Sequence, residues 1–341
     1  MSRPAPLELV CVTCRALDAA GVHAHVLEAR GPETLLCPGC AAEYPVVDGV
    51  ALVLPSGVYP TDPLGALDPA WPPPVDAWCQ GLASADPATP SFVETTLLGT
   101  YGLGHLPGAA PTEALRKALA PRRELSALVE TWLNRHTPPR DLPILELGSA
   151  LGTYAPTWLR ATDADVALLE LRPSMARLSR RLLRGERVSV PWRRVARQFV
   201  PISLELPGDA LDSARVHHVI GDALAPPFLA ERFGLVVAFG LIDAIWDPWV
   251  LLGQLDALVA PGGLLLLAQP FHYEPHAQPP DAWLDGPAAL RRALAGGLEG
   301  LEHLDFRVLE EADAVPWPLP AHNRLVHHYM AHVLLATRAS R

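Results

Sequence analysis

The chain has very little lysine and an excess of acidic residues. Lys117 is the one lysine among 27 basic residues, and 37 acidic residues give a formal net charge of −10. Proteins that bind a phosphate backbone usually carry a basic face. The acidic balance therefore argues against RNA or DNA as a partner. The arginine-rich stretch 177–197 is better explained as a solvated helix face, with Arg180, Arg181 and Arg184 pointing outward.

Long apolar runs are also missing. The longest, such as Leu264 to Ala268, fall far short of the roughly 20 residues that cross a bilayer. Residues 1–12 place Arg, Pro and Glu where a signal peptide needs an unbroken apolar segment. We expect no membrane association and a cytoplasmic location. With 341 residues, 50% of them hydrophobic, the chain can bury a full core in one large domain and a small one, or in two of middling size.

Cysteine is scarce, but four of the five cysteines form two C-x-x-C knuckles, Cys11 to Cys14 and Cys37 to Cys40, separated by 22 residues. Two such turns can complete a tetrahedron of thiolates around zinc. The expected cytoplasmic location disfavours a disulfide. The absence of a surrounding βαβ pattern disfavours a redox pair, and the cysteine spacing differs from those usual for iron–sulfur clusters. Four thiolates leave no open coordination position, so we predict a structural Zn²⁺. Cys79 is expected to be a free thiol.

The second knuckle also carries a resemblance. Cys37-Pro-Gly-Cys40, followed by Tyr44-Pro-Val-Val-Asp48-Gly49, resembles the zinc-ribbon subunit that activates several tRNA, rRNA and protein methyltransferases. The resemblance covers about the first fifty residues and implies a stabiliser or a partial lid. We therefore predict a zinc ribbon over 1–54. A proline-rich, helix-free linker over 55–90 and a large domain over 91–341 are expected to follow.

The large domain alternates between apolar strands and amphipathic helices. Strands are expected at 143–147, 166–169, 216–220, 235–239 and 264–268, and helices at 115–132, 154–160, 174–183 and 250–259. This alternation predicts an α/β fold with a mainly parallel sheet and helices on both faces. Ligands of such sheets bind at the carboxyl ends of the strands.

The first of these strands leads into a glycine turn, Leu145-Glu-Leu-Gly-Ser-Ala-Leu-Gly-Thr-Tyr154, and an acidic residue, Glu170, closes the second strand about twenty residues later. With Asp222 after the third strand and a Pro-Gly-Gly turn before the fifth, the order resembles the Rossmann-like class I methyltransferases from about residue 92 onward. A nicotinamide-binding domain is disfavoured by the Pro-Gly-Gly turn. Ala150 stands where class I methyltransferases usually have the middle glycine of this turn. The resemblance implies an S-adenosylmethionine (SAM) site formed by Glu146, Gly148, Ser149, Gly152, Glu170, Leu171, Asp222, Ala223 and Phe239.

Four later segments, 241–248, 269–273, 282–286 and 324–328, resemble the methyltransferase domain of ovothiol biosynthesis, which methylates an imidazole nitrogen of 4-mercaptohistidine. The chain lacks the iron-dependent sulfoxide-synthase part of that family. The acceptor implied is therefore 4-mercaptohistidine, its selenium counterpart or a related small thiol or amine. Catalytic candidates that could hold the ring N–H or act nearby are Asp243, His272, Tyr273 and His328. Substrate-binding candidates are the aromatic Trp246, Phe271 and Trp283, with Arg324 for a carboxylate.

Two other functions stay open at this point. The ribbon could grip RNA for methylation of an rRNA or tRNA base, or the fold could be a non-catalytic scaffold. The acidic charge weakens the first alternative. The complete set of donor-site residues weakens the second. Phe92 and Tyr101 precede the sheet and could either close over the donor or pack in the core.

Overall fold

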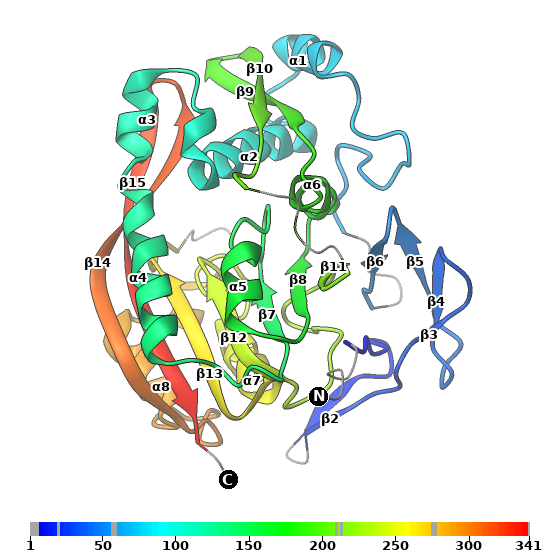
Figure 1. Cartoon of the computed structure of the whole chain (residues 1–341), viewed down its shortest axis with the longest axis vertical. Coiled ribbons are helices and arrows are strands. Elements are labelled where there is room, and N and C mark those ends of the chain that lie inside the picture. Colours follow the sequence, from blue (N-terminus) through cyan, green and yellow to red (C-terminus); the bar gives the residue numbers. More distant parts are fainter. Residues whose placement is uncertain are drawn as a thin grey trace.

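The computed structural model describes residues 7–18, 21–55, 60–208, 211, 214–273 and 278–339. Within these ranges an 11-stranded sheet runs through the molecule in the order β14-β15-β13-β12-β7-β8-β11-β6-β5-β4-β3 (Figure 1). Its strands are β3 Glu28–Ala29, β4 Thr34–Leu36, β5 Glu43–Val47, β6 Val50–Leu52, β7 Ile144–Leu147, β8 Val166–Glu170, β11 Val216–Ile220, β12 Phe233–Phe239, β13 Val259–Gln269, β14 Phe306–His322 and β15 Leu325–Arg338. Two separate hairpins are formed by β1 Ala16–Asp18 with β2 Gly21–His23 and by β9 Val188–Val195 with β10 Gln198–Leu204.

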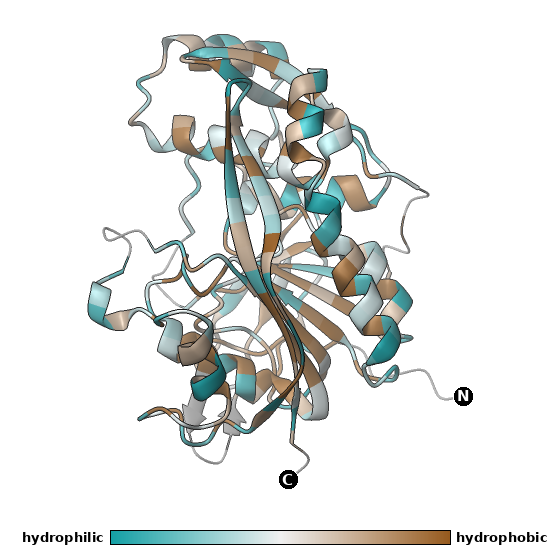
Figure 2. Ribbon diagram, turned by 90° about the vertical axis from the view of Figure 1, so that its left-hand side faces the viewer, coloured by the Kyte–Doolittle hydropathy of each residue, from teal (hydrophilic) through white to brown (hydrophobic). Residues whose placement is uncertain are grey.

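The centre of the sheet is parallel, as the alternating pattern predicts. Strands β13, β12, β7, β8 and β11 all run in one direction. Their apolar residues are buried on both faces, which explains why these segments read as continuous hydrophobic runs rather than as alternating ones. Figure 2 shows the same strands as predominantly hydrophobic ribbons.

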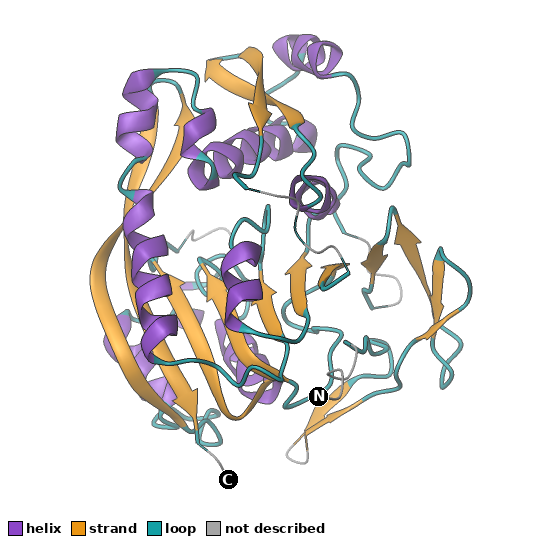
Figure 3. Cartoon of the chain, in the orientation of Figure 1, coloured by secondary structure: helices purple, strands orange, loops and turns teal. Residues whose placement is uncertain are grey.

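Helices cover both faces of this sheet (Figure 3). On one face, α4 Arg122–Arg135 and α5 Ala155–Ala161 pack into one apolar cluster. On the other face, α7 Pro248–Leu258 and α8 Pro287–Leu294 pack into another. Neighbouring residues of a strand point to opposite faces, and in β7 Ile144 joins the first cluster while Leu145 joins the second. The predicted α/β architecture is confirmed.

A third cluster lies beyond the carboxyl ends of the parallel strands, at the top of Figure 1. We call the elements that form it the cap. They are α1 Val75–Ser84, α2 Pro90–His105, the 3₁₀ helix η1 Pro107–Ala109, α3 Glu113–Leu119, α6 Pro173–Leu183 and the β9–β10 hairpin. A second 3₁₀ helix, η2 Pro280–Ala282, precedes α8. The strand ends where ligands are expected therefore face the cap instead of open solvent.

The prediction of a helix-free surface linker over 55–90 is wrong. Helix α1 begins directly after Pro74, and Trp71, Trp78 and Leu82 are buried in the cap. Proline is tolerated before and within the first turn of a helix, where its missing N–H needs no partner. The prolines of this segment therefore mark the start of a helix. The single helix expected around 115–132 is also divided into α3 and α4, which are separated at Pro121.

The ribbon region continues the central sheet. Strand β6 runs parallel to β11, with Ala51 opposite Val219 and Leu52 opposite Ile220. Strands β5, β4 and β3 then extend this edge in antiparallel fashion. The ribbon region and the large α/β domain thus share one sheet and one hydrophobic core, which includes Cys11 and Tyr44.

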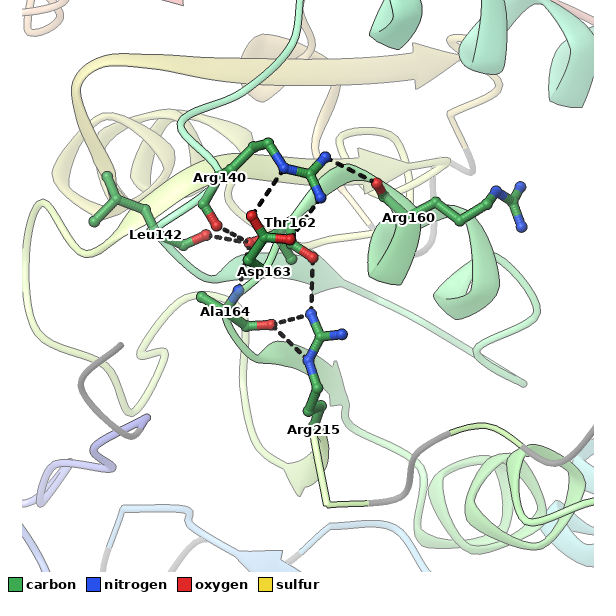
Figure 4. A network of polar contacts seen from close by, with 7 residues as sticks. All are labelled: Arg140, Leu142, Arg160, Thr162, Asp163, Ala164 and Arg215. Carbon is green, nitrogen blue, oxygen red and sulfur yellow. Dashed lines mark hydrogen bonds and ion pairs between the residues drawn. The ribbon is translucent and has the colours of Figure 1, made fainter. Parts of the chain in front are cut away.

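A polar network fixes the amino ends of β7 and β8, opposite the cap (Figure 4). Arg140 donates two hydrogen bonds to the carboxylate of Asp163, at 2.9 and 2.6 Å. Arg215 donates to the carbonyl oxygens of Thr162 and Ala164 at 2.8 and 2.6 Å. These groups bond to one another and to the backbone, so we assign this end of the sheet a structural role. In the described ranges, no helix combines the length and apolarity needed to cross a membrane.

Candidate active site

The glycine turn after β7 adopts an unusual backbone. Gly148, Ala150 and Gly152 all have positive φ, at 68°, 47° and 61°. A Cβ at position 152 would lie 2.4 Å from Ser179 Oγ and 2.8 Å from Leu168 Cδ1, so any other residue would have to displace these side chains at a positive φ. Ala150 takes the same left-handed conformation with a side chain present, which costs about 1 kcal/mol.

The amides of this turn are largely used within the protein. The N–H groups of Gly148 and Ser149 both donate to the carbonyl of Leu169, and that of Gly152 donates to Ser149 O. The Ala150 N–H donates to Glu170. The amides of Gly148, Ser149 and Ala150 therefore tie the turn to β8, and that of Gly152 closes the turn on itself.

Glu170 ends β8 beside this turn. Its Oε2 accepts the Ala150 N–H and its Oε1 accepts the Arg172 N–H, both at 2.9 Å. Burial raises the pKa of this carboxyl group, and the two amides oppose the rise. Each oxygen keeps one lone pair, so the pair can still accept the two hydroxyls of a ribose. Leu171, the next residue, is 48% exposed at the same edge.

Glu146 lies behind the turn and not at its surface. Because side chains alternate along β7, it points toward α5, where its Oε2 accepts the indole N–H of Trp158 at 2.7 Å. Burial raises its pKa to about 8, against the effect of Trp158 and of the nearby Arg122 charge. A group in this position can support the turn but is itself covered by Trp158.

The remaining donor-site candidates follow β11 and β12. Asp222 Oδ1 accepts the Leu224 N–H at 2.9 Å and so shapes the loop after β11, in which Ala223 is buried. Phe239, the last residue of β12, packs edge-on against Tyr154 at 5.3 Å. All nine predicted donor-site residues thus lie in or directly after the neighbouring strands β7, β8, β11 and β12.

Asp243 is the acceptor-site candidate that is both buried and held by a backbone hydrogen bond. It follows β12, is 7% exposed, and its Oδ2 accepts the backbone N–H of His272 at 2.8 Å. Burial raises the pKa of Asp243, while the bond from His272 lowers it. The imidazole of His272 lies 5.3 Å from the ring of Tyr329, between ring centroids.

Tyr273 and Trp283 stack on each other, with centroids 5.1 Å apart and planes at 9°. The Tyr273 hydroxyl donates to Leu284 O and accepts from Leu284 N, and burial raises its pKa to about 12. The pair therefore closes the loop before α8. One face of each ring is covered, and the phenol is already engaged.

The other acceptor-site candidates are less enclosed. Trp246 is 65% exposed, and Phe271 has a positive φ of 53° with its ring 6.3 Å from His332. His328 is exposed on β15, opposite Pro318. Arg324 lies in the β14–β15 turn, eight residues along β15 from His332, which pairs with Gln269 at the end of β13. Eight strand residues span about 26 Å, so the structure does not bring Arg324 to Asp243.

Tyr101 of α2 does face this region. Burial raises the pKa of its phenol, and the charges of Glu170 and Asp243 act in the same direction. The side chain thus lies within electrostatic range of both the donor-site and the acceptor-site carboxylates. Phe92 instead packs in the cap, edge-on against Phe199 at 5.2 Å.

Arg122 was missed by the sequence interpretation. It is 4% exposed at the start of α4, with its guanidinium 4.8 Å from the Trp317 ring centroid and 5.6 Å from that of Tyr154. A signal was present, because Arg122 precedes Leu125 and Val129 by three and seven residues and so shares their buried face. A charge on an apolar helix face requires an explanation.

The four knuckle cysteines converge. Their Sγ atoms all lie within 4.8 Å of one another, with Cys11 and Cys40 at 3.6 Å and Cys14 and Cys37 at 3.8 Å. A tetrahedral zinc site with Zn–S bonds of about 2.3 Å requires S–S separations of about 3.8 Å. The donor set and its spacing therefore fit Zn²⁺. The Tyr44 hydroxyl lies 3.1 Å from Cys11 Sγ and supplies an outer hydrogen-bonding partner. Cys79 is a buried free thiol, as expected.

The chain matches one protein family and has distant matches among solved structures. Residues 114–335, more than half of the chain, match the family described as a methyltransferase domain. Magnesium protoporphyrin IX methyltransferase from Synechocystis PCC 6803 is 13% identical, with a TM-score of 0.45 over 72% of this chain and 96% of that one. A SAM-dependent methyltransferase from Aquifex aeolicus is 12% identical, with a TM-score of 0.38 over 62% of this chain and 89% of that one. No match was found among curated proteins.

The family match covers the glycine turn, Glu170, Asp222 and Asp243, and it extends through most of β15. The enzyme class predicted from the sequence is confirmed. The chain belongs to the methyltransferase domain family.

Proposed function

We propose that this methyltransferase uses SAM to methylate an imidazole nitrogen of a small histidine-derived thiol, 4-mercaptohistidine or its selenium analogue, in ovothiol-type biosynthesis. The observation that carries the proposal is the buried carboxylate of Asp243 at the carboxyl end of β12. Its Oδ2 is anchored by the His272 amide, and its other oxygen can accept an N–H from a planar ring.

The residues around the glycine turn support SAM as the donor. Glu170 has the free lone pairs and the position to accept both ribose hydroxyls, and Asp222 lies where the adenine amine is expected. When bound, SAM supplies an electrophilic methyl carbon on a sulfonium. The protein then has to align the acceptor nitrogen with that carbon and exclude water.

Asp243 would fix the tautomer of the acceptor. An imidazole can attack through one nitrogen only if that nitrogen carries a lone pair, so the proton must stay on the other. A carboxylate holding that N–H enforces this arrangement. Burial, which raises the pKa of Asp243, also makes it a better acceptor for the proton that the ring releases after methylation. Tyr101 and the cap would exclude solvent from this edge.

The test is incubation of the protein with SAM and 4-mercaptohistidine, followed by mass spectrometry and NMR of the product. We expect a singly N-methylated product, and Asp243→Asn should lower kcat about 100-fold with little change in SAM affinity. The exposed Asp281, in η2 of the same region, provides a control in Asp281→Asn, which should leave kcat unchanged. SAM binding without methylation of the thiol would refute the proposed acceptor. Absence of SAM binding by calorimetry would favour a scaffold instead.

A further inference from the structure

Helix α2 of the cap is tied to both strands that carry the donor site. In its first half, Glu94 contacts Arg172 and Ser174, which lie at the start of α6 directly after β8. At its end, His105 Nδ1 lies 2.8 Å from Oγ1 of Thr153, the residue after the glycine turn that follows β7. The two contacts are eleven residues apart, or about 16 Å along the helix axis. Helix α2 therefore spans the donor site and is anchored on either side of it.

The anchor at Glu94 is a buried ion pair. Glu94 is 2% exposed, and its two oxygens accept hydrogen bonds from the Arg172 guanidinium and the Ser174 hydroxyl. The backbone N–H of the same Arg172 donates to Glu170 Oε1 at 2.9 Å. One residue thus links α2 to the carboxylate that is expected to bind the ribose. Because desolvation of both charges offsets their attraction, a buried ion pair adds little net stability. Stability alone therefore does not account for a buried carboxylate at this position.

Tyr101 lies between the two anchors on the same face of α2. It follows Glu94 by seven residues and precedes His105 by four, which is the spacing of one helical face. Burial raises the pKa of the Tyr101 phenol, and the charges of Glu170 and Asp243 act in the same direction, so the phenol lies near both carboxylates. The anchored face of α2 therefore holds Tyr101 between the donor site and the acceptor site.

Helix α2 depends on such anchors because its own sequence favours a helix poorly. Its second half contains three glycines, and glycine weakens a helix interior. A Cβ at Gly99 would lie 2.9 Å from the Trp192 ring, and one at Gly102 would lie 2.8 Å from Leu204, so these glycines let the β9–β10 hairpin pack closely on α2. The hairpin holds one side of the helix. Glu94 and its partners hold the side that faces the donor site.

The Glu94 contact also lies close to the protein surface. The Arg172 side chain is partly exposed, and the neighbouring Val93 and Leu171 are exposed. Water can therefore reach this boundary between α2 and the start of α6. If Glu94 lost its charge, the Arg172 guanidinium would be hydrated and not left buried without a partner. A change at Glu94 should accordingly loosen α2 without unfolding the core.

We propose that Glu94 is a positioning residue for methyl transfer, whose ion pair with Arg172 holds α2 over the bound donor and keeps Tyr101 between donor and acceptor. The inference rests on SAM as the donor in the proposed function, and it does not depend on which acceptor is methylated. Glu94 acts on SAM through α2 and Tyr101 and does not itself contact the ligand.

Isothermal titration calorimetry with SAM and hydrogen-exchange mass spectrometry test this role. Glu94→Met keeps a helix-favouring side chain of similar size and removes both contacts. We expect the affinity for SAM to fall about 10-fold, and amide exchange in α2 to increase with and without SAM. Glu94→Gln retains one acceptor oxygen for Arg172 or Ser174 and should recover part of the loss. Wild-type SAM affinity and wild-type exchange of α2 in Glu94→Met would overturn the proposal.

A double-mutant cycle with Tyr101→Ala tests whether Glu94 acts through the helix. Alone, Tyr101→Ala should also weaken SAM binding. Combined with Glu94→Met it should cause little further loss, because a misplaced Tyr101 already contributes little. If the two losses multiply, Glu94 acts on Glu170 through Arg172 alone and the positioning role is overturned. An unchanged affinity for SAM in Tyr101→Ala would overturn it as well.

Asp256→Leu is the matched control. Asp256 is 6% exposed and accepts a hydrogen bond from Arg338 Nε at 3.1 Å, but it belongs to α7, which packs on the sheet away from the cap. Loss of this buried ion pair should leave both the affinity for SAM and the exchange of α2 unchanged. If the wild-type protein binds SAM with this dependence on Glu94 but leaves 4-mercaptohistidine unmethylated, the role of Glu94 stands and only the proposed acceptor falls.

Discussion

The carboxyl edge of the sheet has two halves that hold their polar side chains in different ways. In the donor half, formed by the ends of β7, β8 and β11, backbone amides no more than 20 residues away in the chain fix the carboxylates, as when Ala150 and Arg172 donate to Glu170. In the acceptor half, formed by the ends of β12 and β13 and the adjoining middle of β15, the contacts come from segments farther apart in the chain. The His272 amide donates to Asp243, 29 residues away, and the His272 ring packs on Tyr329. A local sequence pattern can therefore specify the first half but only part of the second.

The donor half is also anchored from outside by the cysteine unit. Leu9 bridges to Phe228, and the Val10 N–H donates to Pro227 O at 2.9 Å, so the strand leading into Cys11 holds the loop after β11. Asp222 lies in that loop. The acceptor half has no comparable metal-binding cluster among the described residues.

Of the changes considered, metal removal should have the largest effect on the stability of the donor half. Because metal binding by such a site is coupled to folding, chelation should lower the free energy of unfolding by at least about 3 kcal/mol. Hydrogen exchange should increase first in residues 221–228, which the Cys11 strand holds. Urea unfolding and exchange mass spectrometry, with and without chelator, measure both. Cys79→Ser, which alters a cysteine outside the cluster, should retain the metal. Equal stability with and without metal would show that the unit anchors nothing.

Gly152→Ala should have the next largest effect. The added Cβ would meet Ser179 and Leu168 at a positive φ of 61°, and we expect a loss of about 2–4 kcal/mol in stability together with weaker SAM binding. Gly253→Ala in α7 is the control, since its Cβ would meet nothing within 4 Å. That change should stabilise the protein by up to about 1 kcal/mol. If Gly152→Ala changed neither the free energy of unfolding nor the affinity for SAM, the turn would be able to move, and the donor half would be less rigid than its hydrogen bonds indicate.

Glu146→Gln should change the pH dependence of stability. Burial raises the folded-state pKa of Glu146 from 4.5 to about 8, so between these values the folded protein binds more protons than the unfolded chain. Its stabilising contribution is complete below the lower value and is lost as pH rises toward the upper one, an effect on the order of a few kcal/mol. The variant should remove this loss and can still accept the bond from Trp158.

Glu310→Gln provides a contrast of opposite sign. The pKa of Glu310 is lowered, chiefly by a hydrogen bond with His136, so Glu310 stabilises the protein above its unfolded-state pKa and loses that contribution as pH falls. Chemical unfolding from below pH 4.5 up to pH 9 separates the two variants, because the Glu310 effect lies below pH 4.5 and the Glu146 effect lies above it. A wild-type profile that stays flat across this window would remove the assignment for Glu146.

The same contrast explains how much the sequence could predict. The glycine spacing, the acid that ends β8 and the cysteine knuckles depend on residues close in the chain, and all of them lie in the expected elements. Arg324 could not be placed this way, and the periodicity of α4 indicated only that Arg122 is buried, not what surrounds it. The length of the β14–β15 hairpin carries Arg324 away from the site, and a cap that packs on α4 encloses Arg122. Helix α1 was missed because prolines before a helix resemble prolines in a linker.

Ala150→Gly should have the smallest effect, and it tests the donor half most finely. Relief of the left-handed alanine conformation should outweigh the greater flexibility of glycine in the unfolded chain, for a net stabilisation of about 0.5–1 kcal/mol. Ala196, with a φ of 46° in the exposed β9–β10 turn, is a matched control whose glycine variant should be stabilised similarly. Ala150 donates a hydrogen bond to Glu170, and Ala196 does not. We therefore expect the Ala150→Gly variant, but not the Ala196→Gly variant, to change the affinity for SAM. If both variants gain stability and neither alters SAM binding, Glu170 is held by β8 and the Arg172 amide alone, and the glycine turn acts on the donor through shape rather than through that hydrogen bond.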